Sequence, residues 1–247
     1  MRVEAPRWLG LGEESLPAGT SWLTAAEADR AAGLRHRKRH TEYLLRRLVA
    51  KHAVAAVLGR DTSRAALAGI EVANAPGGAP EVFVDGVPFG AGLSISDRAG
   101  WAVGVVGRGL GCDLELVEPR SAGFVRDFLT EPERRLVAGR PAGDERDAEA
   151  NLIWSAKESA LEVLLTGPRR DTREVEVGHG PAAPGDWAAL TVLLADGRRF
   201  AGWGRRYGRF VFTVVTAAPG PPPVALGNPA RLAVAVPRHS WMDRPLR

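Results

Sequence analysis

The sequence predicts an α+β protein made of two lobes. Each half of the chain contains one substantial helical stretch and several short strands whose turn signals favour largely antiparallel pairing. The pattern shifts near Glu118-Pro119-Arg120, so we expect an N-terminal lobe over residues 1–118 and a C-terminal lobe over residues 119–247. No sequence repeat is visible between the two halves.

Two helices are predicted in the N-terminal lobe. Thr24 followed by Glu27 forms a capping box, which opens a helix that runs to about Leu34. A longer, basic helix extends from about Arg39 to Leu58, where apolar residues recur near helical spacing. Gly59 ends it, as a glycine after the last helical turn commonly does.

Short strands follow this helix, and the last two flank a glycine-rich segment, residues 107–111. Because a strand rather than a helix follows that segment, no helix N-terminus is available for a pyrophosphate, and we interpret it as a hairpin connection rather than a dinucleotide loop. The strands predicted here cover residues 70–73, 81–84, 101–106 and 112–117.

The C-terminal lobe begins with a second capping box. Thr130 and Glu133 form it, and Pro132 lies within the first turn. An amphipathic helix is predicted over residues 151–165, and a proline-rich tail from Pro219 is expected to lie along the surface. Strands are predicted over residues 174–177, 188–194, 199–203 and 209–215.

The composition is that of an ordinary soluble protein. Hydrophobic residues make up 45% of the 247 residues and charged residues 25%. No apolar run approaches the roughly 20 residues of a membrane span, and the N-terminus lacks an apolar signal segment, so we expect a cytoplasmic protein with no membrane partner. Cys112 is the only cysteine, which excludes an intrachain disulfide and a cysteine-based zinc site. The net charge of +4 favours anionic partners without choosing among nucleic acid, a nucleotide-like cofactor and an acidic protein.

Two carboxylates share one face of the predicted strand at 112–117. Side chains alternate along a strand, so Asp113 and Glu115 lie on the face opposite Cys112 and Leu114, about 6–7 Å apart. Such a pair repels unless solvent or a cation intervenes, and magnesium favours sparse ligation by carboxylates and water. Taken alone, the segment favours a solvated strand face over a metal site.

The predicted helix at 151–165 carries Trp154, Lys157 and Glu158. Taken alone, these residues indicate packing and a surface ion pair. The two segments together say more. Gly-x-Asp-x-Glu at Gly111 to Glu115, followed about forty residues later by Trp-Ser-x-Lys-Glu-Ser at 154–159, is similar to the signature of the Sfp-type 4′-phosphopantetheinyl transferases.

Two further segments carry the resemblance, which extends over roughly residues 20–215. The stretch from Phe128 to Glu133 resembles the family's aromatic-to-glutamate segment, with Glu133 at the matching place. The basic helix resembles the family's nucleotide-binding helix, with Arg47 the best match. The resemblance implies two similar α/β lobes related by a pseudo-twofold axis, with coenzyme A between them.

The resemblance also implies roles for individual residues. Asp113, Glu115 and Glu158 would bind magnesium, and Glu158 and Lys157 would take part in catalysis, with Lys157 also near the cofactor phosphates. A carrier-protein serine, deprotonated by Glu158 or by a metal-bound water, would attack the β-phosphate. The remaining cofactor-binding candidates are Arg39, Arg47, Lys51, Ser96 and Asp97.

The implied activity is transfer of 4′-phosphopantetheine from coenzyme A to a serine of an acyl or peptidyl carrier protein, as in secondary metabolism. Carrier proteins of this kind are typically acidic, so a basic surface would favour the encounter. We expect a monomer. We expect no nucleic-acid partner, because aromatic residues do not interleave with the basic ones.

Two positions depart from the family pattern. Asp97 stands where the family has a histidine, and Glu162 stands where it usually has a lysine, both near the cofactor phosphates. At about 4 Å, each new repulsion amounts to about 1–4 kcal/mol across the plausible range of dielectric constants. The same changes place extra carboxylates in the expected cleft, where crowded carboxylates raise one another's pKa.

These departures leave alternatives open. The first is a working transferase with altered phosphate contacts. The second is a transferase-fold protein recruited to acid–base catalysis on a small molecule or carrier-bound intermediate through Asp97, Glu158 and Glu162, with coenzyme A binding impaired. The third is a carrier-protein or nucleotide-binding module without catalytic activity.

Overall fold

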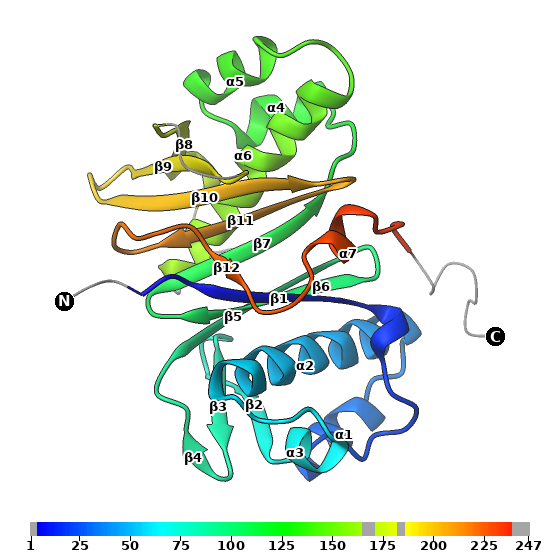
Figure 1. Ribbon diagram of the computed structural model, residues 1–247. Coiled ribbons are helices and arrows are strands. Elements are labelled where there is room, and N and C mark those ends of the chain that lie inside the picture. The colour runs from blue at the N-terminus through cyan, green and yellow to red at the C-terminus, as the bar shows by residue number, and fades with distance from the viewer. Residues whose placement is uncertain (1–3, 165–170, 182–185, 239–247) are drawn as a thin grey trace. The chain divides into compact units, whose positions relative to one another are not determined.

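A computed structural model describes residues 4–164, 171–181 and 186–238, and these fold as a mixed α/β protein (Figure 1). The contacts divide the chain into two compact units. We call residues 109–223, which group with the first residues of the chain, the C-terminal unit. Residues 6–108, together with the described residues from Val224 onward, form the N-terminal unit.

The N-terminal unit places its long helix against an antiparallel sheet to which the end of the chain adds one parallel strand. The hydrogen-bonded strand order is β12-β1-β6-β5, and a second sheet has the order β2-β3-β4. The elements are β1 (Arg7–Gly12), α1 (Ala25–Ala32), α2 (Arg37–Leu58), α3 (Arg64–Ala68), β2 (Ile70–Asn74), β3 (Pro80–Val84), β4 (Val87–Pro88), β5 (Gly92–Arg98), β6 (Trp101–Gly107), β12 (Val224–Ala225) and α7 (Ala230–Ala233).

The C-terminal unit has one antiparallel sheet of order β7-β11-β10-β9-β8, covered by its long helix. The elements are β7 (Leu110–Leu116), α4 (Ala122–Phe128), α5 (Glu131–Ala138), α6 (Asp144–Val163), β8 (Val175–His179), β9 (Ala188–Leu194), β10 (Arg199–Tyr207) and β11 (Phe210–Thr216). Short 3₁₀ turns lie at Glu13–Ser15 in the N-terminal unit and Thr172–Glu174 in this one.

Most of the predicted elements are present, and the differences have local causes. Helix α6 begins well before residue 151, at Asp144, where three acidic residues in the first turn favour a helix N-terminus; the predicted end at Leu165 lies outside the described residues. Strands β1 and β5 were not predicted. The tail after Pro219 contributes β12, which pairs in parallel with β1.

The two units divide earlier in the chain than the expected boundary at residue 118. Strand β7 pairs along its length with β11, for example Asp113 with Thr213, so its residues group with the C-terminal unit. The stretch from Val224 groups with the N-terminal unit because β12 pairs with β1.

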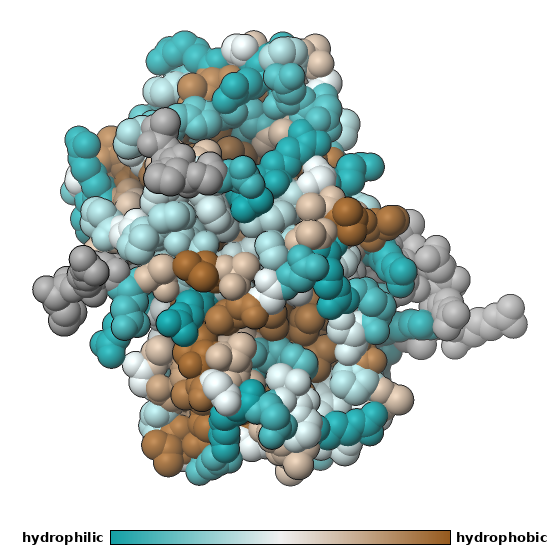
Figure 2. All heavy atoms as spheres, viewed as in Figure 1, coloured by the Kyte–Doolittle hydropathy of each residue, from teal (hydrophilic) through white to brown (hydrophobic). Residues whose placement is uncertain are grey.

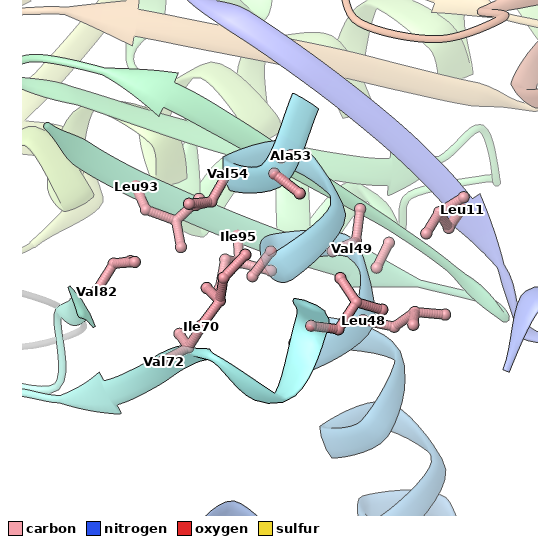
Figure 3. Close-up of a cluster of buried hydrophobic side chains, with 14 of the residues drawn as sticks. Leu11, Leu48, Val49, Ala53, Val54, Ile70, Val72, Val82, Leu93 and Ile95 are labelled. Atoms are coloured by element: carbon pink, nitrogen blue, oxygen red, sulfur yellow. The ribbon is translucent and has the colours of Figure 1, made fainter. Parts of the chain in front are cut away.

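The core of the N-terminal unit forms between α2 and the strands around it. Leu48, Val49 and Val54 of α2 meet Ile70 of β2 and Ile95 of β5 (Figure 3). All five side chains are buried. This packing fixes which face of α2 turns inward; Arg39 and Arg46 remain exposed, whereas Arg47 is buried.

No helix within the described ranges is long and apolar enough to cross a membrane. Figure 2 shows apolar side chains in brown on one face of the N-terminal unit, among polar ones. Val87, Val234 and Val236 are the most exposed of the large apolar residues in this unit. Single exposed apolar residues of this kind are normal on the surface of a folded protein.

The two units have several features in common, although no repeat is visible in the sequence. In the N-terminal unit β1, β6 and β5 are neighbours and β3 packs beside β5; in the C-terminal unit the order is β7-β11-β10-β9-β8. In chain order, the long helix of each unit follows the first long strand of that unit and precedes its other sheet strands: α2 follows β1, and α6 follows β7 (Figure 1).

A buried ion pair recurs at equivalent positions. Glu27 accepts hydrogen bonds from the backbone of Thr24 and Val72 and pairs with Lys51 at 2.6 Å. Glu133 likewise accepts from Thr130 and Val177 and pairs with Lys157 at 2.8 Å. The spacing from glutamate to lysine is the same in both units. Each unit therefore combines a capping box with a buried glutamate–lysine pair.

Candidate functional site

The two carboxylates of β7 lie on the sheet face that α6 covers. The register pairs Asp113 with Thr213 of β11, and the Thr213 hydroxyl meets the hydroxyls of Ser155 and Ser159 at 2.8 and 2.7 Å. Residues directly opposite each other in an antiparallel pair share a face, so Asp113 faces the helix as well. The predicted alternation is confirmed: Cys112, Leu114 and Leu116 are buried.

Glycine at position 111 allows the helix and strand to approach closely. A Cβ atom at Gly111 would overlap the carbonyl oxygen of Ser159 and lie 2.7 Å from the Cβ of Glu162. The backbone N–H of Cys112 donates to the Glu162 carboxylate at 3.3 Å. Since β7 is an edge strand of its sheet, this hydrogen bond satisfies a donor that faces away from β11.

Glu115 accepts one hydrogen bond and forms one ion pair. The indole N–H of Trp154 donates to its Oε1 at 3.1 Å, and the Arg120 guanidinium lies 3.3 Å from its Oε2. Arg120 also donates to Asn151 at 2.6 Å and stacks over Phe124 at 4.7 Å. Sequence reasoning did not find Arg120 as part of the site; it was noted only as part of the boundary segment.

Trp154 is fixed by an aromatic cluster that joins α4 to α6. Phe124 and Phe128 of α4 stand 5.1 and 5.4 Å from the Trp154 ring, both edge-on. The indole nitrogen is thereby aimed at Glu115. The tryptophan of the Trp-Ser-x-Lys-Glu-Ser motif therefore orients a carboxylate in addition to packing.

Glu158 is the motif residue that stands nearest to other carboxylates. Burial raises the pKa of Glu158, and the neighbouring charges of Glu162 and Glu115 raise it further. Glu158 is half-buried and Glu162 is exposed. A carboxylate in this environment is a better proton acceptor near neutral pH than an ordinary glutamate.

Lys157, predicted beside the phosphates, lies inside the core. Its side chain has 0% exposed surface, and its ammonium pairs with Glu133 and donates to the carbonyls of Thr172 and Val175. Burial lowers the pKa of Lys157, and the Glu133 carboxylate opposes that shift. This placement favours a structural role over the predicted contact with phosphate.

Lys51 has the same environment in the N-terminal unit. Its ammonium pairs with Glu27 and donates to the carbonyls of Trp22 and Leu67 at 3.3 and 3.0 Å, with no exposed side-chain surface. A fully enclosed ammonium has no route to a ligand unless the core opens. The structure therefore favours a structural role for this predicted cofactor-binding residue too.

The other predicted cofactor residues surround a cavity of about 520 Å³ in the N-terminal unit. Arg39 and Arg47 line it together with Arg30 and Arg46, so four guanidinium groups face one space. Arg47 stacks over Tyr43 at 4.7 Å and donates to Asn74 at 2.8 Å. Four carboxylates, from Glu27, Glu42, Glu71 and Asp97, line the same cavity, whose volume is in the range of small-molecule sites.

Asp97 lies in the wall of the same cavity. Its carboxylate is 3.6 Å from Arg46 and only 17% exposed. Burial raises its pKa to about 6, although Arg46 opposes the shift. Ser96 is the preceding residue on β5, so its side chain points to the opposite face of the strand and does not line the cavity.

The magnesium ligation expected for Asp113, Glu115 and Glu158 stays a prediction. Among the described residues, no three histidine, cysteine, aspartate or glutamate side chains are placed to hold a metal ion together. Asp113, Glu115 and Glu158 all come from the β7–α6 contact, but both Glu115 oxygens already face donors, Trp154 and Arg120. Arg120 supplies positive charge where the prediction placed a metal.

The comparisons with known proteins support the motif-based resemblance. Residues 109–184 match the family model of the 4′-phosphopantetheinyl transferase superfamily. The matched segment contains β7 and α6, and so both halves of the motif. It confirms the resemblance at the level of the superfamily, over this segment, and does not specify the Sfp type. No curated protein matches the chain.

Proposed function

We propose that this protein transfers 4′-phosphopantetheine from coenzyme A to a serine of an acyl or peptidyl carrier protein. The observation that supports this most strongly is that the superfamily match covers the strand and helix whose contact gathers Asp113, Glu115 and Glu158. The proposal includes the family's arrangement of two similar lobes about a pseudo-twofold axis. The recurring Glu–Lys pairs support that part of it.

In the proposed reaction, the carrier serine oxygen attacks the β-phosphorus of coenzyme A. The bond from that phosphorus to the bridging oxygen breaks, and 3′,5′-ADP leaves with the bonding electrons. The serine proton passes to Glu158, whose raised pKa suits a general base. The Arg120 guanidinium lies beside Glu115 and so places a positive charge next to that carboxylate.

The 3′-phosphoadenosine end of coenzyme A is proposed to occupy the cavity of the N-terminal unit. Arg39 and Arg47 supply guanidinium groups, which bind phosphate with two parallel hydrogen bonds. Arg47 is already oriented by Tyr43 and Asn74, so it loses little freedom on binding. Asp113, Glu115 and Glu158 would hold magnesium, which would neutralise charge on the pyrophosphate; Glu115 would then give up its contact with Arg120 or Trp154.

Calorimetric titration with coenzyme A, with and without magnesium, tests the binding step. We expect saturable micromolar binding by the natural protein, and tighter binding by the Asp97→His/Glu162→Lys double variant because two repulsions are removed. Failure of both proteins to bind coenzyme A would contradict the proposal. Binding by the double variant alone would identify a site disabled by its two carboxylates.

Transfer itself is tested by mass spectrometry of an acyl carrier protein incubated with coenzyme A. Glu158→Gln should slow modification by about 100-fold or more, in the range typical of a lost general base, while coenzyme A still binds. Glu145→Gln, a change of the same kind elsewhere on α6, is the control and should leave the rate unchanged. An unchanged rate in Glu158→Gln would exclude this residue as the base.

A second candidate function is acid–base catalysis on a small molecule or carrier-bound intermediate. The raised pKa values favour it, since Glu158 and Asp97 both hold protons at higher pH than ordinary carboxyls. Such an enzyme depends on Asp97 or Glu162 and has no need of coenzyme A. Loss of activity in Glu162→Gln with carrier modification unaffected would distinguish it from the transferase.

A further inference from the structure

A second cavity lies in the C-terminal unit, with a volume of about 370 Å³. We call it the His179 pocket. It forms where α6 passes β8 and β10, and Arg140, Glu149, Leu152, His179 and Gly204 are among its lining residues. None of these residues belongs to the proposed transfer site.

The His179 pocket has the same place in its unit as the arginine-lined cavity has in the N-terminal unit. In the N-terminal unit the cavity is lined by α2, by β2, the first strand after that helix, and by β5, the first strand of the β5–β6 hairpin. In the C-terminal unit the corresponding elements are α6, β8 and β10. The repeated fold therefore leaves two cavities. Their side chains differ, so we expect different ligands.

A buried carboxylate organises the His179 pocket. Glu149 is only 4% exposed, and it accepts from Nε and Nη2 of Arg140 at 2.8 Å and lies 2.7 Å from Nε2 of His179. The Arg140 and His179 side chains remain 45% and 35% exposed. Glu149 therefore holds each side chain through one side of its polar group. Nη1 of Arg140 and Nδ1 of His179 are the nitrogens that can contact a ligand.

The charge of the pocket limits the charge of its ligand. Arg205 and Arg206 also line it, but they pair with Asp186 at 2.6 Å and with Asp144 at 2.6 Å. Glu145 and Asp186 are part of the lining as well. The lining thus contains three guanidinium groups and three carboxylates, so their formal charges cancel and ligands with more than one negative charge are disfavoured.

The inner wall of the pocket is apolar. Leu152 of α6, Ala188 of β9 and Val211 of β11 contribute it, and Gly204 adds no side chain. A Cβ atom at Gly204 would lie 2.7 Å from the Leu152 side chain, so only glycine at this position lets Leu152 keep its place in the wall. A ligand here buries an apolar body against the wall and directs an acidic end toward Arg140.

We propose that the His179 pocket binds a small monocarboxylate with a short aliphatic chain. The carboxylate accepts from Arg140 beside His179, and the chain lies on Leu152, Ala188 and Val211. A planar carboxylate matches the planar guanidinium, and the buried Glu149 holds the guanidinium in position before binding. This site is separate from the proposed transfer chemistry.

Calorimetric titration of the full chain with hexanoate tests this assignment. We expect saturable binding at one site, with hexylamine failing to bind because its charge is opposite and inorganic phosphate binding more weakly because it has no apolar part. Absence of saturable hexanoate binding would overturn the proposal. Equal binding of phosphate and hexanoate would overturn it too, since it would identify a simple anion site.

Variants locate the binding within the pocket. Arg140→Gln should weaken hexanoate binding by about tenfold or more, the effect of losing a charged hydrogen bond. Arg199→Gln makes the same change at an exposed position of β10 outside the pocket and should leave binding unchanged. Ala188→Phe, from an exposed strand position, should fill the pocket and abolish binding while the protein remains folded. Unchanged binding in both pocket variants would exclude this site.

Discussion

Asp97 is one of four carboxylates in the lining of the arginine-lined cavity, and its charge depends on pH. It stands on β5 among residues of α2, with Arg46 at 3.6 Å and Glu42 and Lys38 also near enough to affect it. Burial raises its pKa to about 6 from an ordinary value of 3.8. The repulsion expected from the sequence is therefore present in full only above about pH 6.

The pH dependence of folding stability follows from this shift. The folded protein keeps the Asp97 proton up to about pH 6, whereas the unfolded chain loses it near 3.8, so the folded state binds more protons between these values. The free energy of unfolding should therefore fall as pH rises from about 4 to about 6, by on the order of 2–3 kcal/mol.

Urea unfolding of the natural protein and Asp97→Asn across this pH range measures the contribution. The difference between the two proteins should change with pH as stated, because the asparagine does not titrate. Asp29→Asn, the same chemical change at an exposed position of α1, is the control and should leave the pH profile as it is. A difference independent of pH would contradict the raised pKa.

At the scale of an element, the contacts of helix α6 account for most residues of the Trp-Ser-x-Lys-Glu-Ser motif. Trp154 orients Glu115, Ser155 and Ser159 meet Thr213, and Lys157 pairs with Glu133. Each of these contacts fixes the helix on β7 and its neighbours. Glu158 is the motif residue left facing other carboxylates, which is why we assign the proton transfer to it.

Gly111→Ala tests the close contact of β7 with α6. The added methyl group would collide with the Ser159 carbonyl, which is backbone and cannot turn aside. We expect a loss of about 1–3 kcal/mol in the free energy of unfolding, because overpacking forces the helix away from the strand. Chemical denaturation measures the loss.

Gly123→Ala in α4 is the matched control. A Cβ atom there has its nearest neighbour at 3.6 Å, so it fits without strain. Alanine favours a helix interior over glycine by about 0.5–1 kcal/mol, so this variant should be as stable as the natural protein or more so. If both variants behaved alike, the contact at residue 111 would not limit the packing of α6.

At the scale of the whole molecule, the recurring Glu–Lys pair is the clearest sign of a repeated unit. Both lysines have no exposed side-chain surface, and both glutamates also accept hydrogen bonds from the strand that follows the long helix. The pair joins a short helix, the long helix and that strand in each unit. We infer that the pair holds these three elements together in both units.

Lys51→Met and Lys157→Met should therefore have similar effects. Each leaves a buried carboxylate without its cation, which costs about 3–5 kcal/mol. Lys38→Met removes an exposed lysine from the i,i+4 pair with Glu42 and should cost about 0.5 kcal/mol or less. Denaturant unfolding measures all three; a loss below about 1 kcal/mol at either buried site would contradict a shared structural role.

The sequence by itself determined the features that depend on neighbouring residues. The capping boxes at Thr24 and Thr130, the long helix ending at Gly59 and the alternation of Asp113 and Glu115 all follow from local spacing. The motif spacing also indicated the superfamily that residues 109–184 match. Local geometry is enough for these because each involves atoms within a few residues of one another.

The tertiary structure alone decided which charged groups face a ligand and which support the core. Lys51 and Lys157 have the same chemistry as surface lysines in the sequence, but their carboxylate and carbonyl partners lie many residues away. Arg120 and Glu149 acquire their partners the same way. The energy of a charge depends on burial and on partners that only the folded chain brings together, so spacing along the sequence does not specify it.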